Sequence, residues 1–135
     1  MTARTQPCNR SDAAARLTQA DSYVQVAELV LSDVTETANA GIAAALAVLG
    51  GIAASDAACC ARLAMRARGQ SHSEAVTVLR SVQPGGPEMA KDLQRLVDRK
   101  DSSHYGLAFL TTSEAAKMVQ WAKRLAAAAR RAVES

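Results

Sequence analysis

Residues 37–69 read TANAGIAAALAVLGGIAASDAACCARLAMRARG, and this stretch decides the fold class. Residues 37–55 carry no charged side chain, and alanine and glycine make up most of them. Alanine is the strongest helix former, and it allows neighbouring helices to pack closely. We therefore expect one long helix over residues 37–69, with Gly69 as its C-terminal stop.

An apolar seam at alternating steps of three and four residues runs along this predicted helix and should face a core. Gly50 and Gly51 at its middle indicate either a kink or a very close crossing of two helices. The uncharged stretch is long enough to span a membrane, but its large apolar residues are few. We interpret it as the central buried helix of a soluble bundle, with no membrane partner. The seam consists of Ile42, Leu46, Leu49, Ala53, Asp56, Cys60 and Leu63.

The sequence on either side of this stretch predicts further helices of the same kind. They cover residues 11–36, 73–82, 87–104 and 111–133, with a Pro-Gly turn at 84–87. The expected fold is all-α, an antiparallel bundle of four main helices plus a short extra helix. Their N-terminal caps are Ser11, Ser71 with Glu74, and Thr111 with Glu114. The predicted core seams are Ala13, Leu17, Ala20, Val24, Ala27, Leu31 and Val34 in the first helix, Met89, Leu93, Leu96 and Val97 in the fourth, and Ala115, Met118, Ala122, Leu125, Ala129 and Ala132 in the last.

The chain length of 135 residues fits a single domain, predicted over residues 11–135 after a disordered tail over residues 1–10. The three cysteines, Cys8, Cys59 and Cys60, are odd in number and two of them are neighbours, which does not indicate a disulfide framework. The N-terminus has no apolar run that would mark a secretory signal. Together these features predict a reducing, cytoplasmic location, with Cys59 and Cys60 as small core residues.

Charge is distributed unevenly along the chain. Residues 11–58 carry six acids and one base, whereas residues 59–135 carry thirteen bases and seven acids. A basic half can attract the phosphates of RNA, although a solvated helix face has the same composition. The candidate RNA-binding residues are Lys100 and, along the last helix, Lys117, Lys123, Arg124 and Arg131.

The sequence has no phosphate-binding glycine loop, no cysteines or histidines at metal-ligand spacing, and no nucleophile elbow. We therefore expect neither a cofactor nor a metal site. The informative segment is residues 95–105, RLVDRKDSSHY, in which Arg99 precedes His104 by five positions. Five positions on a helix correspond to about 140° of rotation, so the two side chains flank one edge and converge only through the length of the arginine.

Arg99 and His104 resemble the signature of the HEPN superfamily, small helical-bundle proteins of which many are metal-independent RNases. That signature is an arginine, four to six residues, and then a histidine, near the junction of a core helix with the last helix. Arg99 and His104 match it in spacing and in position. The layout of the predicted helices over residues 11–133 is similar as well.

Three features differ from the family's pattern. The residue after the arginine is often Asn, Asp or His in the family and is Lys100 here. Tyr105 directly follows His104, whereas one residue intervenes in the subgroup that is paired with nucleotidyltransferase antitoxins. Arg66 and His72 also satisfy the spacing, and we prefer the later pair because it precedes the last helix.

The resemblance implies a specific chemistry. His104 would move the proton between the RNA 2′-hydroxyl and the leaving oxygen, and Arg99 would stabilise the charge of the transition state. The product would be a 2′,3′-cyclic phosphate, and DNA would not be cleaved because it lacks the attacking hydroxyl. The resemblance also implies a homodimer with a fuller site across its axis, a toxin-type or stress-response role, and an antitoxin or nucleotidyltransferase partner.

Asp56 lies on the apolar seam of the central helix, where a buried carboxylate must find a partner or stay protonated. One hypothesis is that Asp56 reaches Arg99, His104 or Tyr105 and orients them, which makes these four the candidate catalytic residues. The alternative is an internal hydrogen bond to a serine or tyrosine without catalytic purpose.

Two other functions fit the same residues. The chain would be a non-catalytic helical module that binds a partner protein or a nucleotide if Arg99 and His104 only stabilise the end of their helix. It would be an RNA-binding scaffold if the basic last helix contacts phosphates without cleavage.

Overall fold

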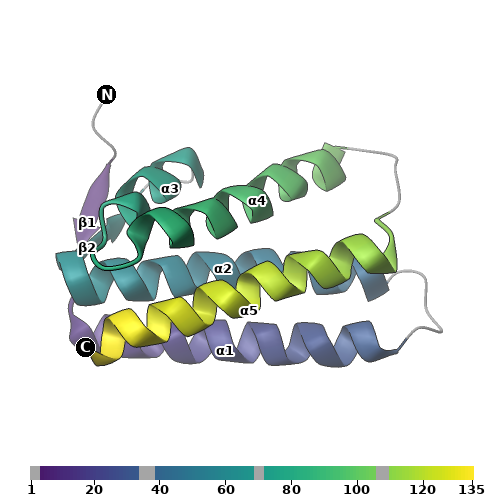
Figure 1. Ribbon diagram of the computed structural model, residues 1–135, viewed down its shortest axis with the longest axis horizontal. Coiled ribbons are helices and arrows are strands. Elements are labelled where there is room, and N and C mark those ends of the chain that lie inside the picture. The colour runs from purple at the N-terminus through teal and green to yellow at the C-terminus, as the bar shows by residue number, and fades with distance from the viewer. Residues whose placement is uncertain (1–3, 34–38, 69–71, 106–109) are drawn as a thin grey trace.

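The computed structural model describes residues 4–33, 39–68, 72–105 and 110–135, with side chains throughout except at residues 100–105. Over these residues the chain forms four long helices, one short helix and a small two-stranded sheet (Figure 1). The predicted all-α fold is confirmed. The helices are α1 (Arg10–Ser32), α2 (Asn39–Leu63), α3 (His72–Arg80), α4 (Gly86–Tyr105) and α5 (Thr112–Glu134), and the strands are β1 (Thr5–Pro7) and β2 (Met65–Ala67).

α2 forms the centre of the bundle and packs against α1, α4 and α5. The four long helices run alternately in opposite directions, with α5 crossing in front of α2 in Figure 1. The short helix α3 lies beside the first half of α4, and the β1–β2 sheet sits near the C-terminal end of α2.

The seams predicted for α1, α4 and α5 face the core. Every described residue of these three seams is buried except Leu31, which is half-buried, and Val34 lies outside the described residues. The capping box predicted at the start of α5 is also confirmed, because the Thr111 hydroxyl accepts from the backbone N–H of Glu114 at 3.0 Å and the Glu114 carboxylate accepts in return from Thr111. The spacing of the apolar residues therefore predicted the buried faces of α1, α4 and α5, and the capping box predicted the start of α5.

The seam predicted for α2 is partly wrong. Ile42 and Leu49 are about half exposed, at 48% and 45%, while the alanines of the opposite face are buried. Small side chains allow the backbones of α1, α4 and α5 to approach α2 closely, so the alanine face forms the core contact. The larger residues point outward as a result. The buried residues near the start of α2 are Ala40, Ala43, Ala44, Ala47 and Val48.

Gly50 and Gly51 mark a close helix crossing, one of the two predicted outcomes. α2 is continuous across both glycines. A Cβ on Gly50 would lie 3.3 Å from side-chain atoms of Tyr23 and Val24 on α1, and a Cβ on Gly51 would lie 2.5 Å from Leu96 Cδ1 on α4. A side chain at Gly51 would force its neighbours to move, and one at Gly50 would make unusually tight contacts.

The N-terminal segment is a correction to the predicted disordered tail. Residues 5–7 form β1, which pairs antiparallel with β2, and Cys8 forms a disulfide with Cys60 of α2. The prediction that the cysteines form no disulfide is therefore wrong, and the prediction of a tail over residues 1–10 is wrong for residues 4–10. Residues 1–3 lie outside the described residues. Because Cys8 and Cys60 are far apart in sequence, only the fold brings the two thiols together.

The start of α1 and the end of α2 differ from the predicted bounds for local reasons. The N-cap of α1 is Asn9, two residues before the predicted cap Ser11, because Asn9 and Asp12 form the capping box. α2 ends at Leu63 rather than near Gly69, because Ala64 adopts a positive φ of 57° and the chain turns into β2. The Ala64 carbonyl then accepts a hydrogen bond from the Cys8 N–H at 3.1 Å, which ties the end of α2 to the N-terminal segment.

Among the described residues, α2 is the one helix that is long and apolar enough to cross a membrane, with a mean hydropathy of 1.8 over its best window. In this structure 72% of that window is buried inside the bundle. Such burial is typical of the core helix of a soluble protein, as the sequence predicts.

Candidate functional site

Arg99 lies on α4 opposite the first turn of α5. Its Nη1 donates to the Glu114 carboxylate at 3.3 Å, and both side chains are partly exposed. His104 and Tyr105 belong to the last turn of the same helix, so five positions of continuous helix separate Arg99 from His104. The side chains of Lys100, His104 and Tyr105 lie outside the described residues.

Asp56 is buried, as its place on the seam predicts, but its partners are not those of the catalytic hypothesis. Its Oδ2 accepts from Arg16 Nε at 3.1 Å, from Arg16 Nη2 at 2.9 Å and from Arg66 Nη1 at 3.1 Å. Two guanidiniums thus compensate a carboxylate that is only 6% exposed. A basic or hydroxyl partner was predicted, and the partners are two arginines, neither of which was among the candidates.

Asp56 and Arg99 lie on opposite sides of the contact between Gly51 and Leu96. α2 and α4 run in opposite directions (Figure 1), so the two residues are displaced from this contact toward opposite ends of the bundle. At about 1.5 Å of rise per residue, the separation along the helix axes is roughly 12 Å. The hypothesis that Asp56 orients Arg99 is therefore corrected.

The Asp56 cluster joins four elements. Arg16 comes from α1 and also donates to the Gln19 side chain at 2.6 Å, while Arg66 comes from β2. With its amide oxygen facing the guanidinium, Gln6 of β1 accepts from Arg66 Nε at 3.0 Å. This cluster connects the small sheet and α1 to the end of α2. It also gives a structural role to Arg66, which with His72 was the other pair that fits the HEPN spacing.

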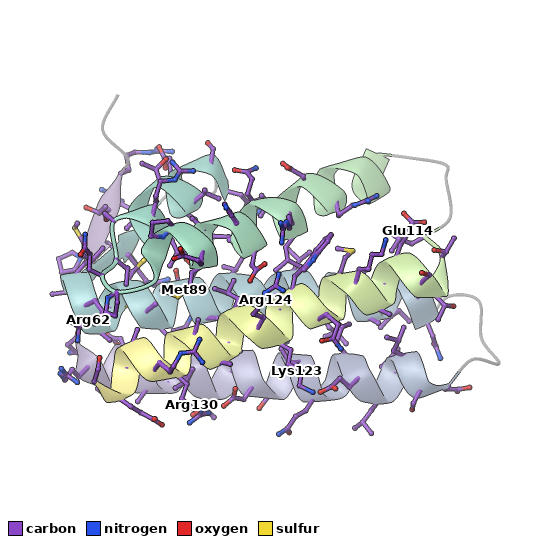
Figure 2. The ribbon with its side chains drawn as sticks, viewed as in Figure 1. Arg62, Met89, Glu114, Lys123, Arg124 and Arg130 are labelled. Carbon is purple, nitrogen blue, oxygen red and sulfur yellow. A yellow bond between two sulfur atoms is a disulfide. The ribbon has the colours of Figure 1, made fainter. Side chains whose placement is uncertain are left out.

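Two of the basic residues of α5 form ion pairs with acids of α1. Lys123 pairs with Glu28 at 3.2 Å, and Arg130 pairs with Asp21. Figure 2 shows both labelled side chains on the α1 side of α5. The acidic first half of the chain and the basic second half therefore neutralise each other in part across the α1–α5 contact, which explains much of the charge asymmetry without RNA.

Arg124 faces the other way, toward α4 (Figure 2). Its Nε and Nη2 donate to the buried carboxylate of Asp92 at 2.8 and 2.5 Å, and Arg95 donates to the same carboxylate at 3.4 Å. The hydrogen bonds to Asp92 raise the pKa of Arg124 above its ordinary value. The Arg95 guanidinium lies 5.9 Å from the centre of the Trp121 ring, a cation–π distance.

We define the α4–α5 face as Arg95, Arg99, Lys117, Trp121 and Arg124. The first two lie one helical turn apart on α4, and the last three lie on the side of α5 that faces α4. Arg95 and Trp121 were not predicted as site residues from the sequence. Arg95 could have been found from its position one helical turn before Arg99. Its contact with Trp121 depends on how α4 and α5 are aligned, which the sequence does not show.

Glu114 connects this face to the start of α5. Its hydrogen bonds to the backbone and side chain of Thr111 lower its pKa, and the nearby charges of Arg99 and Lys117 lower it further. Glu114 is therefore ionised in the folded protein at neutral pH, and it serves both as a helix cap and as the ion-pair partner of Arg99.

The remaining cysteine, Cys59, is buried and free. Burial, with the charge of Asp56 as a smaller cause, raises the pKa of its thiol to about 12. Such a thiol is unreactive at neutral pH, which agrees with its predicted role as a core residue. Among the described residues, no group of three or more histidine, cysteine, aspartate or glutamate side chains is arranged to hold a metal ion.

Searches against family models, curated proteins and solved structures find no match for this chain. The resemblance to the HEPN superfamily therefore depends on Arg99, His104 and the layout of helices alone.

Proposed function

We propose that this chain binds RNA on its α4–α5 face and cleaves it without a metal ion. The observation that supports binding most is the pair of arginines, Arg95 and Arg124, which the buried carboxylate of Asp92 holds beside Trp121. A buried anchor limits the side-chain entropy that two surface arginines would otherwise lose when a ligand binds.

The chemistry of this face suits single-stranded RNA. Arg124 uses Nε and Nη2 on Asp92 and Arg95 uses Nη1, so each guanidinium has further N–H groups that do not bond Asp92 and that phosphate oxygens can accept from. The half-buried Trp121 adds an aromatic surface on which a base can stack. Phosphate contact and base stacking are the two features that single-strand binders combine.

The proposed cleavage uses Arg99 and His104, in the roles that the family resemblance implies. Arg99 is half exposed and its described ion-pair partner, Glu114, is also partly exposed, so a phosphate can replace that contact at modest cost. The same continuous helix carries His104 one and a half turns later. Arg99 would stabilise the charge on the phosphate while His104 transfers the proton.

Binding is tested with two matched substitutions on α5. Lys117→Ala removes a cation from the α4–α5 face, whereas Lys123→Ala removes one that pairs with Glu28 on the α1 side. We expect Lys117→Ala to weaken binding of single-stranded RNA and to reduce the slope of log affinity against log salt by about 0.7. Lys123→Ala should leave both unchanged. Equal effects of the two variants would contradict the assignment of the α4–α5 face.

Cleavage is tested with the two histidines of the chain. Purified wild-type protein and the His72→Ala variant should cleave total RNA in the presence of a chelator and leave 2′,3′-cyclic phosphate ends. His104→Ala should be inactive while its RNA affinity is retained. If the wild type binds RNA but does not cleave it, the result would support the RNA-binding scaffold and contradict the proposed enzyme.

The biological role that we propose is that of a toxin-type or stress-response enzyme, silenced by an antitoxin or nucleotidyltransferase partner. Growth arrest on expression, relieved by Arg99→Ala, would support this role. The proposal includes a cytoplasmic location because cellular RNA is the substrate. The cysteines no longer argue for that location, because disulfides such as Cys8–Cys60 persist mainly in oxidising compartments.

A further inference from the structure

The outward sides of α1 and α2 form an apolar surface. Among the described residues, five large hydrophobic side chains are exposed, and four of them lie here: Val26, Leu29, Ile42 and Leu49. We define the α1–α2 face as these four residues together with the exposed Ala45. Leu29 is 70% exposed, more than any other large hydrophobic residue described.

The five residues that define this face are uncharged, and Asp33, at the C-terminal cap of α1, follows Leu29 by four positions. The acids in the middle of α1, Asp21 and Glu28, turn toward α5, where they pair with Arg130 and Lys123. α2 contains no charged residue from Asn39 to Ser55. Nucleic acid and anionic membranes are recognised through lysine and arginine, so neither fits this surface.

The face has both a groove and a ridge. A shallow groove of about 320 Å³ lies between the two helices. Val26 lines one end of the groove. The exposed side chain of Leu29, about one turn further along α1, forms the ridge. The residues that line the groove are Thr18, Gln19, Ser22, Tyr23, Val26 and Leu46.

We infer that the α1–α2 face binds the same face of a second copy of this chain, as a two-fold symmetric dimer. In such a dimer each surface meets itself, so a charged patch would oppose its own charge, whereas an uncharged patch is self-complementary. The ridge at Leu29 of one copy can enter the groove at Val26 and Leu46 of the other. Apolar composition and depletion of charge are the features of homodimer interfaces.

Small residues on α2 favour close contact between the copies. Gly41 and Ala45 are exposed on the outward side of α2, one turn apart. A Cβ added at Gly41 would meet nothing within 4 Å, so this position is open to an approaching partner. The two α2 helices can therefore approach each other more closely than helices that carry larger side chains.

This dimer differs from the one that the HEPN resemblance implies. The α4–α5 face involves the other long-helix pair, so both copies would present their Arg99 residues outward, each in its own site. The inference does not depend on RNA binding, because none of the residues on the α1–α2 face belongs to the α4–α5 face.

The test compares two identical substitutions of exposed alanines by sedimentation of the full chain at micromolar concentrations. Ala45→Glu places a charge in the α1–α2 face, and Ala127→Glu places one on α5 outside it. Wild type and Ala127→Glu should sediment at twice the chain mass of 14.1 kDa. Ala45→Glu should raise the dimer dissociation constant about a hundredfold or more, because the two-fold axis buries the charge twice.

Leu29→Ser provides a second variant at an exposed site, where the fold has little to lose, and circular dichroism verifies that each variant is folded. It should also weaken the dimer. A wild-type chain that sediments as a monomer would overturn the inference, as would a dimer that both variants leave intact. Binding of the monomeric wild type to neutral phosphatidylcholine vesicles would instead identify the face as a membrane-binding surface.

Discussion

At the scale of single residues, the buried carboxylate of Asp56 connects the end of α2 to α1 and β2. This carboxylate accepts from two arginines, whereas the place of Asp56 on an apolar seam had predicted only that a basic or hydroxyl group would approach it. The partners were not predictable, because Arg16 lies on another helix and Arg66 falls in a segment that was predicted to be helical. Arg66 reaches Asp56 because the chain turns at Ala64, whereas Arg16 reaches it through the packing of α1 against α2.

We predict that Asp56→Asn destabilises the protein by about 2 kcal/mol, because it removes charge-assisted hydrogen bonds and leaves two guanidiniums around a neutral group. The cost should stay moderate, since Arg16 and Arg66 are partly exposed and can be rehydrated. Urea unfolding measures the change. Glu134→Gln, in an exposed ion pair with Arg130 at the end of α5, serves as the control and should change stability by less than about 0.5 kcal/mol. Equal effects of the two substitutions would show that the Asp56 cluster contributes nothing specific.

At the scale of elements, regular helices were predictable and their irregular ends were not. The Thr111–Glu114 capping box and the seam of α5 are local patterns, and both are confirmed. The N-terminal segment depends instead on contacts between residues far apart in sequence, β1 with β2 and Cys8 with Cys60. No pattern within residues 1–10 indicates these contacts.

We predict that breaking the disulfide costs up to about 4 kcal/mol, the value that loop closure gives for a sequence separation of 52. Thermal unfolding with and without a dithiol reductant measures this cost, and reduction should lower the midpoint of the wild type. The Cys8→Ser variant should start at the lower midpoint and show no response to reductant. A wild type that is insensitive to complete reduction would contradict the prediction.

The first turn of α5 should be sensitive to acid. The folded pKa of Glu114 lies below its ordinary value of 4.5, so the stability from its ionised form is present above that value and is lost as the pH falls through the folded pKa. Glu114→Gln removes this contribution and should therefore flatten the acid side of the stability profile, measured by urea unfolding at a series of pH values. A variant with an unchanged acid slope would exclude Glu114 as a source of it.

At the scale of the whole molecule, the central helix determines how the bundle is packed. Its alanines and glycines allow α1, α4 and α5 to approach closely, and this leaves Ile42 and Leu49 on the surface. The seam predicted for α2 is buried at Ala53, Asp56 and Cys60 but exposed at Ile42 and Leu49. Periodicity gave more weight to the large apolar residues of the first half than to the close packing of its alanines.

Gly51→Ala should test this packing. A Cβ at position 51 would lie 2.5 Å from Leu96, which is fully buried, so Leu96 or the whole of α4 must move. Overpacking costs about 1–3 kcal/mol and the better helix propensity of alanine returns about 1 kcal/mol, so we expect a net loss of stability. The Gly41→Ala variant has open space around its Cβ within one copy of the chain, so at concentrations where the chain is monomeric it should be stabilised instead. Calorimetry of both variants measures the difference.

The candidate site was predictable only in part. Arg99 and the basic residues of α5 were identified from spacing and charge, but their partners depend on how the helices face one another. Lys123 turns toward Glu28 and Arg124 toward Asp92, although they are adjacent in sequence. Arg95 and Trp121, which meet across two helices, could be recognised only in the structure.

The covalent link between residues 8 and 60 also decides how tension would travel through the molecule. A pull on the two chain ends passes from sulfur to sulfur and bypasses everything between them. α1 and most of α2 would therefore bear no force, because they lie in the loop that the disulfide closes, while β2, α3, α4 and α5 are unfolded and extended. An optical trap should therefore record a shorter extension for the oxidised chain than for the reduced one, by the contour length of the hidden loop.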